Sequence, residues 1–352
     1  MLDLDNLALF KTIDPDSMLK HISGFPQQCR AAWELAQGIV LPERYKQAKS
    51  IVVLGLGGSA IGGDFVRTLV QEECPLPIMI HRDYTLPAFV GPETLVIASS
   101  YSGNTEETLI TSQAALEAGA SLVAVTTGGK LAQWAEENKL PCVRFSYISQ
   151  PRAAVGYSFS LVLGIICRLG WAADKTADMQ EAMTVMENWQ AEIRETAPAA
   201  RNEAKQMAQW LWGCLPVVYG AGYLSEVARR WKGQVNENAK AWGFFEQMPE
   251  LNHNAILGYK APKVLQEKMR VIMLRSSLDH SRNQKRFQVT EEVLKNQGIS
   301  CKIVQARGQC PLAHLLSTVH FGDYVSYYLA MLYQNDPTPV GDITYLKEWL
   351  AE

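Results

Sequence analysis

Hydroxyl-bearing side chains gather in one short stretch of the chain, Ser99-Ser100-Tyr101-Ser102-Gly103-Asn104-Thr105. The stretch follows an apolar run, Leu95 to Ala98, and acidic residues that open a helix come after it. Its hydroxyls, its backbone N–H groups and the positive end of the helix dipole together favour an anion. No Lys or Arg lies within the stretch, so we expect hydroxyls and amides to hold a phosphate there. The alternative is that Thr105 only caps the helix and the serines fill a turn.

A glycine-rich turn follows an earlier apolar run and reads Gly55-Leu56-Gly57-Gly58-Ser59-Ala60. This resembles the start of a dinucleotide-binding fingerprint, with Ala60 in place of the third glycine. The acidic residue expected about twenty positions further on is hard to find, since only Asp83 lies near that distance. A Walker phosphate loop is excluded because no GK[ST] motif is present. The hydroxyl of Ser59 fits a small phosphate ester, and the alternative is a plain helix cap.

Two ionisable residues flanked by asparagines are candidates for proton transfer. Glu237 lies in Asn236-Glu237-Asn238-Ala239-Lys240, and His253 lies in Glu250-Leu251-Asn252-His253-Asn254. Glu and His are the residue types that move protons to and from carbon and oxygen near neutral pH. The alternative for both segments is a surface loop in which the asparagines only form turns.

Two cations complete the set of candidate site residues. Arg152 follows a proline and precedes an apolar helical run, so its charge lies at a helix start, where the dipole disfavours a cation. That position favours an anionic partner, either a substrate or an internal carboxylate. Lys347 lies in the C-terminal segment Tyr345-Leu346-Lys347-Glu348-Trp349-Leu350, where its type and position alone favour an exposed helix lysine.

Composition limits the function classes. The chain has 352 residues, 47% of them hydrophobic, and a formal net charge of −3, which gives it no general attraction for nucleic acid or anionic membranes. The start of the chain lacks the features of a secretory signal, and no apolar run is long enough to span a bilayer. Seven cysteines without a CxxC pair argue against a disulfide framework or a zinc site. We therefore expect a reduced, soluble, cytoplasmic protein without a metal site.

Short apolar runs alternate with helical segments along most of the chain, which predicts parallel sheets covered on both faces by helices. The predicted strands are 51–54, 77–81, 95–98, 121–125, 142–145, 216–222, 271–274 and 301–304. Ligands of such sheets bind at the carboxyl ends of the strands, where both hydroxyl-bearing turns lie. The predicted parts are an N-terminal helical arm (1–45), two α/β domains (46–170 and 213–335), a helical connection (171–212) and a C-terminal tail helix (336–352).

These segments together resemble the bifunctional phosphoglucose/phosphomannose isomerases of the sugar-isomerase (SIS-domain) superfamily. The matching motifs run in order from about residue 45 to the C-terminus and are specific as a set; they are GLGGSAIGGD, SYSGNTEET, PRAAVGY, RWKGQVNENAK, PELNHN and DPTPV with a following LK. The resemblance implies two SIS domains, a homodimer, and interconversion of glucose 6-phosphate, and of mannose 6-phosphate, with fructose 6-phosphate through a cis-enediol. No cofactor is implied.

The resemblance also implies site residues. The phosphate of the sugar would be held by Gly58, Ser59, Ser100, Ser102 and Thr105. Glu237 would move the proton between C1 and C2, and Arg152 would lie beside the enediolate. His253, expected from the neighbouring subunit, would open the ring, and Lys347 would lie near the ring oxygen and the phosphate.

One position departs from the family pattern. Ala255 stands where members of the family often carry an acidic residue after the His-Asn pair. If that acid orients His253, we expect either slower ring opening or another group in its place. Two other functions remain open: a non-catalytic SIS-type sensor of sugar phosphates, and an isomerase or aminosugar enzyme acting on another phosphosugar. A sensor would not need Glu237 and Arg152.

Overall fold

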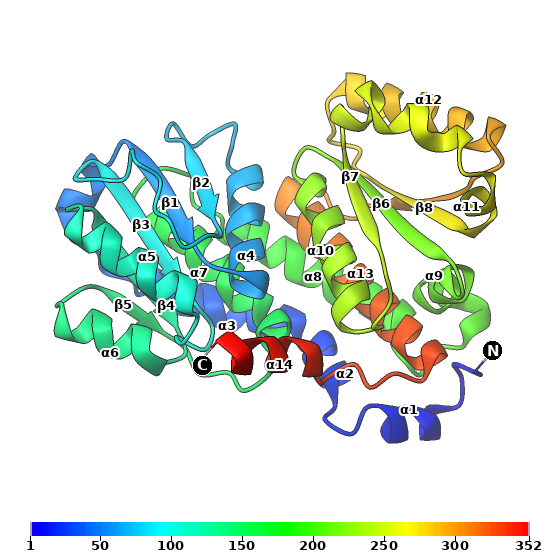
Figure 1. Ribbon diagram of the computed structural model, residues 1–352, viewed down its shortest axis with the longest axis horizontal. Helices are drawn as coiled ribbons and strands as arrows, with labels where there is room; N and C mark the ends of the chain where they lie inside the picture. The colour runs from blue at the N-terminus through cyan, green and yellow to red at the C-terminus, as the bar shows by residue number, and fades with distance from the viewer. Residues whose placement is uncertain (1, 351–352) are drawn as a thin grey trace. The chain divides into compact units, whose positions relative to one another are not determined.

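The computed structural model describes residues 2–350, which form two compact units, each built around a parallel β-sheet (Figure 1). The N-terminal sheet unit comprises Gly24–Thr184 and Cys310–Ala313. The C-terminal sheet unit comprises the residues up to Ser23, Val185–Gln309 and the residues from His314 on. The predicted α/β class is confirmed. None of the helices described is long and apolar enough to cross a membrane.

Five strands form the sheet of the N-terminal unit in the order β2-β1-β3-β4-β5, all parallel. Every residue of β3 is buried, because a central strand of a parallel sheet has both faces covered. This explains why the predicted strands read as continuous apolar runs. The strands are β1 (Ser50–Leu54), β2 (Ile78–His81), β3 (Thr94–Ser99), β4 (Ser121–Thr126) and β5 (Cys142–Arg144).

Helices cover both faces of this sheet. The chain moves in opposite directions from β1 and from β3, so right-handed crossovers place α4 on one face and α5 and α6 on the other (Figure 1). Helix α7 packs against both α3 and α4. The helices are α3 (Phe25–Gln37), α4 (Gly57–Leu69), α5 (Glu106–Glu117), α6 (Gly129–Glu137) and α7 (Val155–Arg168), with short 3-10 turns η1 (Glu43–Gln47) and η2 (Pro151–Ala154).

The sheet of the C-terminal unit repeats this plan with four parallel strands in the order β7-β6-β8-β9. Here β6 and β8 are the central neighbours, as β1 and β3 are in the other unit. One face packs on α12 through a core that includes Tyr219, Phe287 and Leu294. The strands are β6 (Leu215–Ala221), β7 (Phe244–Met248), β8 (Met269–Arg275) and β9 (Ser300–Gln305).

Helix α10 leads to Glu237 and packs closely on α13 (Pro311–Tyr333). The indole of Trp231 is buried and donates from Nε1 to the carbonyl oxygen of Thr318 at 3.0 Å. A Cβ at Gly322 would overlap this indole, so glycine is needed there. The helices of this unit are α1 (Leu7–Ile13), α2 (Met18–Ser23), α9 (Glu203–Leu211), α10 (Leu224–Glu237), α11 (Lys263–Lys268), α12 (Ser281–Asn296) and α14 (Gly341–Leu350), with η3 (Ala199–Arg201), η4 (Glu250–His253) and η5 (Ala255–Lys260). Helices α8 (Thr176–Ile193) and α13 (Pro311–Tyr333) have residues in both units.

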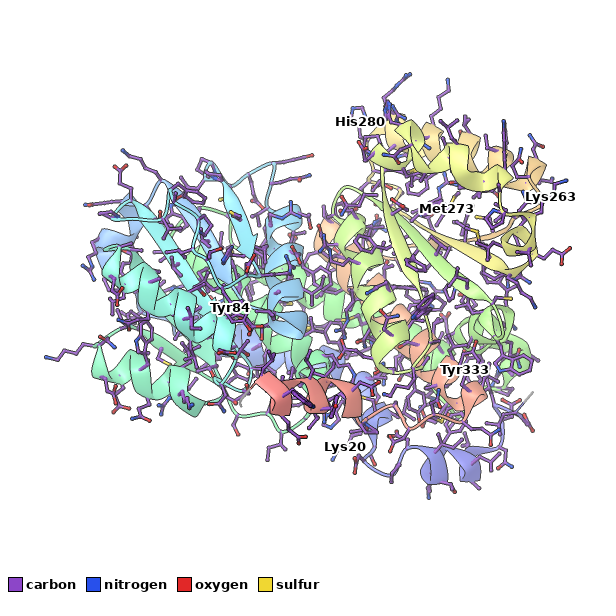
Figure 2. All side chains as sticks on the ribbon, in the orientation of Figure 1. Lys20, Tyr84, Lys263, Met273, His280 and Tyr333 are labelled. Carbon is purple, nitrogen blue, oxygen red and sulfur yellow. The ribbon has the colours of Figure 1, made fainter. Side chains whose placement is uncertain are left out.

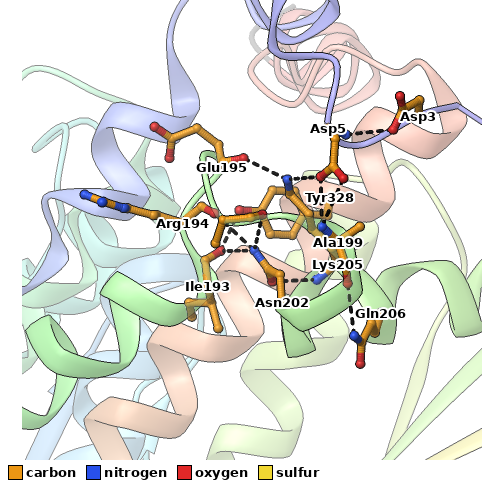
Figure 3. A network of polar contacts seen from close by, with 11 residues as sticks. Asp3, Asp5, Ile193, Arg194, Glu195, Ala199, Asn202, Lys205, Gln206 and Tyr328 are labelled. Carbon is orange, nitrogen blue, oxygen red and sulfur yellow. Dashed lines mark hydrogen bonds and ion pairs between the residues drawn. The ribbon is translucent and has the colours of Figure 1, made fainter.

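A buried lysine ties the first residues of the chain to α9 (Figure 3). The side chain of Lys205 is 0% exposed, and its ammonium donates to the Asp5 carboxylate at 2.9 Å and to the Glu195 carbonyl at 2.7 Å. Asn202 caps α9 by accepting from the Lys205 backbone N–H, and its amide donates to the carbonyl of Ile193. A buried ammonium needs such partners, because removing it from water is costly.

Replacing Asp5 with Asn should lower the melting temperature at neutral pH and change it little in acid. The hydrogen bond from Lys205 lowers the pKa of Asp5 below its ordinary value of 3.8. The stabilisation is therefore complete above pH 3.8 and is lost as the pH falls through the lower folded-state pKa. Melting curves of both proteins at about pH 7 and about pH 2 test this. A melting difference that is the same at both pH values would contradict it, and Asp16→Asn on the same arm is the control.

Candidate active site

The glycine loop after β1 runs directly into α4 without a side-chain cap. Gly57 has φ +50°, a conformation that glycine adopts at little cost. Leu56 occupies the N-cap position and cannot accept a hydrogen bond from the first turn. Ser59 lies within the helix, is buried, and accepts from the backbone N–H of Tyr101 at 3.1 Å. Ser59 is therefore not a helix cap; it joins the first loop to the second.

The hydroxyl-rich loop after β3 also leaves its helix uncapped. Thr105 occupies the N-cap position of α5, but its side chain makes no capping hydrogen bond. Its Oγ1 lies 2.9 Å from Oγ of Ser100 instead, and Ser100 also accepts from the Gly103 backbone N–H. Ser102 is exposed, and its Oγ accepts from the N–H of Asn104 at 3.2 Å. The interpretation of Thr105 as a side-chain cap is wrong, and the first turn of α5 keeps amides available for an anion.

Contacts with the segment after β4 fix the shape of this second loop. The hydroxyl of Thr127 donates to the carbonyl of Tyr101 at 2.7 Å, and the backbone N–H of Leu131 donates to the carbonyl of Gly103 at 2.9 Å. Gly103 has φ +69°, and a Cβ there would overlap the carbonyl oxygen of Gly128. The loop is therefore held in one conformation before any ligand arrives, which reduces the entropic cost of binding.

Arg152 lies beside the start of α4, in the turn η2 that leads into α7. Arg152 as a whole residue is 2% exposed. A Cβ at Gly58 would lie 2.6 Å from the carbonyl oxygen of Pro151 and 3.0 Å from the Cα of Arg152. The glycine thus lets the first turn of α4 approach the backbone that carries the arginine. The structure brings Gly58, Ser59, Ser100, Ser102, Thr105 and Arg152 together in the N-terminal unit.

A cavity of about 10 Å³ lies beneath the two loops, lined by Ser59, Tyr101, Pro151 and Ser158 among others. This volume is about that needed for one water molecule and is far too small for a sugar. This cavity therefore has no room for a sugar phosphate, and the exposed Ser102 does not line it.

Glu237 is the last residue of α10, and the segment around it is held at several points. The ammonium of Lys240 donates to the Glu237 carbonyl at 2.5 Å, and the amide of Asn238 donates to Oγ of Ser326 at 3.0 Å. The amide of Asn335 donates to the carbonyl of Ala239 at 2.9 Å. Glu237 is half-buried, and these hydrogen bonds hold the backbone on both sides of it. A carboxylate held in a fixed position is the kind of group that proton transfer uses.

The two remaining candidates are exposed. His253 ends the turn η4, where the neighbouring Asn254 donates to the Glu250 carboxylate at 2.6 Å. Lys347 lies on α14, a helix whose described residues are all exposed. Glu237, His253 and Lys347 all belong to the C-terminal unit.

The loop of the C-terminal unit that corresponds to the hydroxyl-rich loop follows β8 and is closed by its own side chains. Oγ of Ser276 lies 2.5 Å from the hydroxyl of Tyr223 and 2.7 Å from Nδ1 of His314. The Asp279 carboxylate accepts from the Ser276 backbone N–H at 3.0 Å, and burial raises the pKa of Asp279 to about 6. His280, labelled in Figure 2, caps α12 by accepting from a backbone N–H. This loop is therefore closed by hydrogen bonds to the side chains of Asp279, Tyr223 and His314.

Sequence reasoning missed the contacts that connect the site residues. It did not identify the backbone of Tyr101 as the partner of Ser59, or Lys240 as the donor to the Glu237 carbonyl. Tyr101 lies inside the hydroxyl-rich stretch, and that position was the one signal available. Within residues 2–350, no group of three or more His, Cys, Asp or Glu side chains could hold a metal ion.

Comparisons with known proteins agree with the motifs. Residues 200–350 match the family model described as the bacterial phospho-glucose isomerase C-terminal SIS domain. A bifunctional phosphoglucose/phosphomannose isomerase from Caldicellulosiruptor bescii is 41% identical over 336 residues, which cover 95% of this chain and 99% of the relative. One from Aquifex aeolicus is 35% identical over 305 residues, which cover 86% of this chain and 91% of the relative.

A solved structure supports the same fold. The crystal structure of a hypothetical protein from Thermus thermophilus aligns with a TM-score of 0.73 at 17% identity, covering 99% of this chain and 93% of that one. At this identity the likeness concerns the fold alone, whereas the two sequence relatives match over most of their own length. The chain therefore belongs to the bifunctional phosphoglucose/phosphomannose isomerase family.

Proposed function

We propose that this protein is an aldose–ketose isomerase that interconverts glucose 6-phosphate and mannose 6-phosphate with fructose 6-phosphate. The observation that carries the proposal is the 41% identity over 99% of a relative that bears this name. Two uncapped helix starts lined with hydroxyls, in the N-terminal unit, support a phosphorylated substrate.

The proposed reaction divides into ring opening, proton transfer and stabilisation of charge. His253, supplied by the partner subunit of a homodimer, opens the ring. Glu237 removes the proton from C2 of the opened aldose, which gives the cis-enediol, and then returns a proton to C1, which gives fructose 6-phosphate. Arg152 lies beside the enediolate oxygen and stabilises its negative charge. Lys347 lies near the ring oxygen and the phosphate. These steps need only acid–base groups and a cation, so we propose no metal or cofactor.

The phosphate end of the substrate is proposed to bind Gly58, Ser59, Ser100, Ser102 and Thr105. Holding a remote phosphate keeps the reacting carbons in register with the catalytic groups. We further propose a cytoplasmic enzyme that binds neither nucleic acid nor membranes, with SIS domains at 46–170 and 213–335, an arm at 1–45, a connection at 171–212 and a tail at 336–352.

Coupled assays that start from fructose 6-phosphate test this function. We expect formation of both glucose 6-phosphate and mannose 6-phosphate by the wild-type protein. If neither product forms but the protein still binds phosphosugars, the function is that of a non-catalytic sensor. Activity on a different phosphosugar alone would assign another isomerase specificity.

Replacing Ser102 with Ala should raise KM for fructose 6-phosphate about ten-fold or more and lower kcat much less. Ser102 is exposed, and in the proposed site its hydroxyl donates to the phosphate. A hydrogen bond to a charged group contributes about 1.5–3 kcal/mol. Because the phosphate is held equally in the ground state and the transition state, the loss appears in KM. The control is Ser277→Ala, an exposed serine after β8. An unchanged KM in Ser102→Ala would argue against the phosphate site.

A further inference from the structure

Tyr101 lies in the middle of the hydroxyl-rich loop, yet its side chain bonds a different segment. Its hydroxyl donates to the carbonyl of Tyr147 at 2.6 Å and accepts from the backbone N–H of Ser149 at 2.8 Å. The phenol therefore bonds both a backbone acceptor and a backbone donor of the segment after β5. We call these two hydrogen bonds the Tyr101 bridge. The ring of Tyr101 lies beside Phe145, with centroids 6.3 Å apart.

The segment held by this hydroxyl leads directly to Arg152. Ser149 is followed by Gln150 and Pro151, and the turn η2 begins at Pro151. The Ser149 hydroxyl donates to the Gln150 carbonyl at 2.9 Å, and the Ala153 backbone N–H donates to the same carbonyl at 2.9 Å. Hydrogen bonds thus hold the backbone at successive residues between the Tyr101 bridge and the arginine. A displacement of Ser149 would therefore also displace Arg152.

The backbone of Tyr101 makes the remaining connections. Its N–H donates to Oγ of Ser59 in the first loop, and its carbonyl accepts from the hydroxyl and the backbone N–H of Thr127 after β4. Tyr101 therefore contacts the first loop, the segment after β4 and the segment that precedes Arg152, all at the carboxyl ends of the strands.

A second contact holds Arg152 from the side of α4. The hydroxyl of Ser158 donates to the Gly58 carbonyl at 3.0 Å, and Gly58 has no space for a Cβ against Pro151. The arginine backbone is therefore held between the first turn of α4 and the Tyr101 bridge. Both phosphate loops are thus connected by hydrogen bonds to the segment that carries Arg152.

We infer that Tyr101 is a positioning residue that couples occupation of the phosphate loops to the placement of the Arg152 guanidinium. This inference rests on the proposed function, in which Arg152 stabilises the enediolate. Tyr101 itself does not touch the reacting carbons. Its removal should therefore weaken stabilisation of the transition state and leave the phosphate contacts of Ser100, Ser102 and Thr105 in place.

The kinetic test uses Tyr101→Phe, which keeps the ring and removes only the hydroxyl. We expect kcat for fructose 6-phosphate to fall about ten-fold, because a small displacement of a catalytic group has a large effect on rate, while KM changes less than about two-fold. The inhibition constant of inorganic phosphate should stay the same. The matched control is Tyr157→Phe, whose ring stacks on Phe145 and whose hydroxyl is not part of the bridge; it should keep wild-type kcat and KM.

A double-mutant cycle with Arg152→Lys shows whether Tyr101 acts through the arginine. In the Arg152→Lys background, Tyr101→Phe should cause little further loss of kcat. An equal loss in both backgrounds, a rise in KM with unchanged kcat, or the same loss in Tyr157→Phe would overturn the inference.

Hydrogen–deuterium exchange separates this inference from the proposed function. Saturating inorganic phosphate should slow exchange of the amides of residues 147–154 in the wild type and have no such effect in Tyr101→Phe. Equal protection in the two proteins, with melting temperatures confirming that both are folded, would overturn the coupling. Phosphate could protect residues 147–154 in the wild type and not in Tyr101→Phe while the wild type does not isomerise fructose 6-phosphate. That result would contradict the proposed function and still support the coupling.

Discussion

Replacing Glu237 with Gln should lower kcat for fructose 6-phosphate by about 10²–10⁴, the range contributed by a positioned general base. Glutamine has nearly the same shape and cannot accept the proton from carbon. The backbone of this segment is held by Lys240 and by the Asn238–Ser326 contact, neither of which uses the carboxylate, so the fold should be kept. KM should change little, because the proposed phosphate site is unaltered.

Glu267→Gln on α11 is the control, since it makes the same chemical change at an exposed position of the same unit. Its kinetics should equal those of the wild type. Solvent deuterium incorporation at C2 offers a second measurement, which Glu237→Gln should suppress together with turnover. Wild-type turnover in Glu237→Gln would assign the base to another residue.

Replacing Gly103 with Ala should lower kcat/KM about 100-fold, mainly through KM, because a displacement of about 1 Å in a binding group can have an effect of this size. The left-handed backbone at φ +69° costs an L-residue about 1–2 kcal/mol. The added Cβ would also overlap the Gly128 carbonyl, so the loop must move away from the segment after β4. Inhibition by inorganic phosphate should weaken in parallel.

The control Gly170→Ala separates the effect of a left-handed backbone from that of steric overlap by the added Cβ. Gly170 has φ +80° in the same unit, but nothing lies within 4 Å of an added Cβ. This variant should lose about 1–2 kcal/mol of stability and keep wild-type kinetics. If the two variants show the same kinetics, the shape of the hydroxyl-rich loop does not matter for binding.

The sequence predicts the sheets well where strands are central. Strands such as β3 are buried along their whole length and read as unbroken apolar runs. The edge strand β7 is absent from the predicted set because its residues are partly exposed, so Phe244 and Phe245 read as aromatics in a polar loop. The single helical connection expected at 171–212 ends one helix at Ile193 and starts another at Glu203, capped by Asn202.

The sequence indicates the residue types of the candidate site, but it does not indicate the contacts between them. Hydroxyls after β3 indicate a phosphate site from local chemistry alone. The sequence could not distinguish Thr105 as a cap from Thr105 as a partner of Ser100, because both use the same atom. The bridge from Tyr101 to Ser149 joins residues far apart in the chain, and spacing carries no signal for such a pair.

The closed loop after β8 distinguishes the two sheets of the chain. Both sheets have the same plan, but the loop after β8 is closed by the Asp279 carboxylate, whereas hydroxyl groups bond one another in the loop after β3. Under the proposed function the two copies of the scaffold have different tasks: one holds the phosphate, and the other contributes Glu237 from the end of a helix.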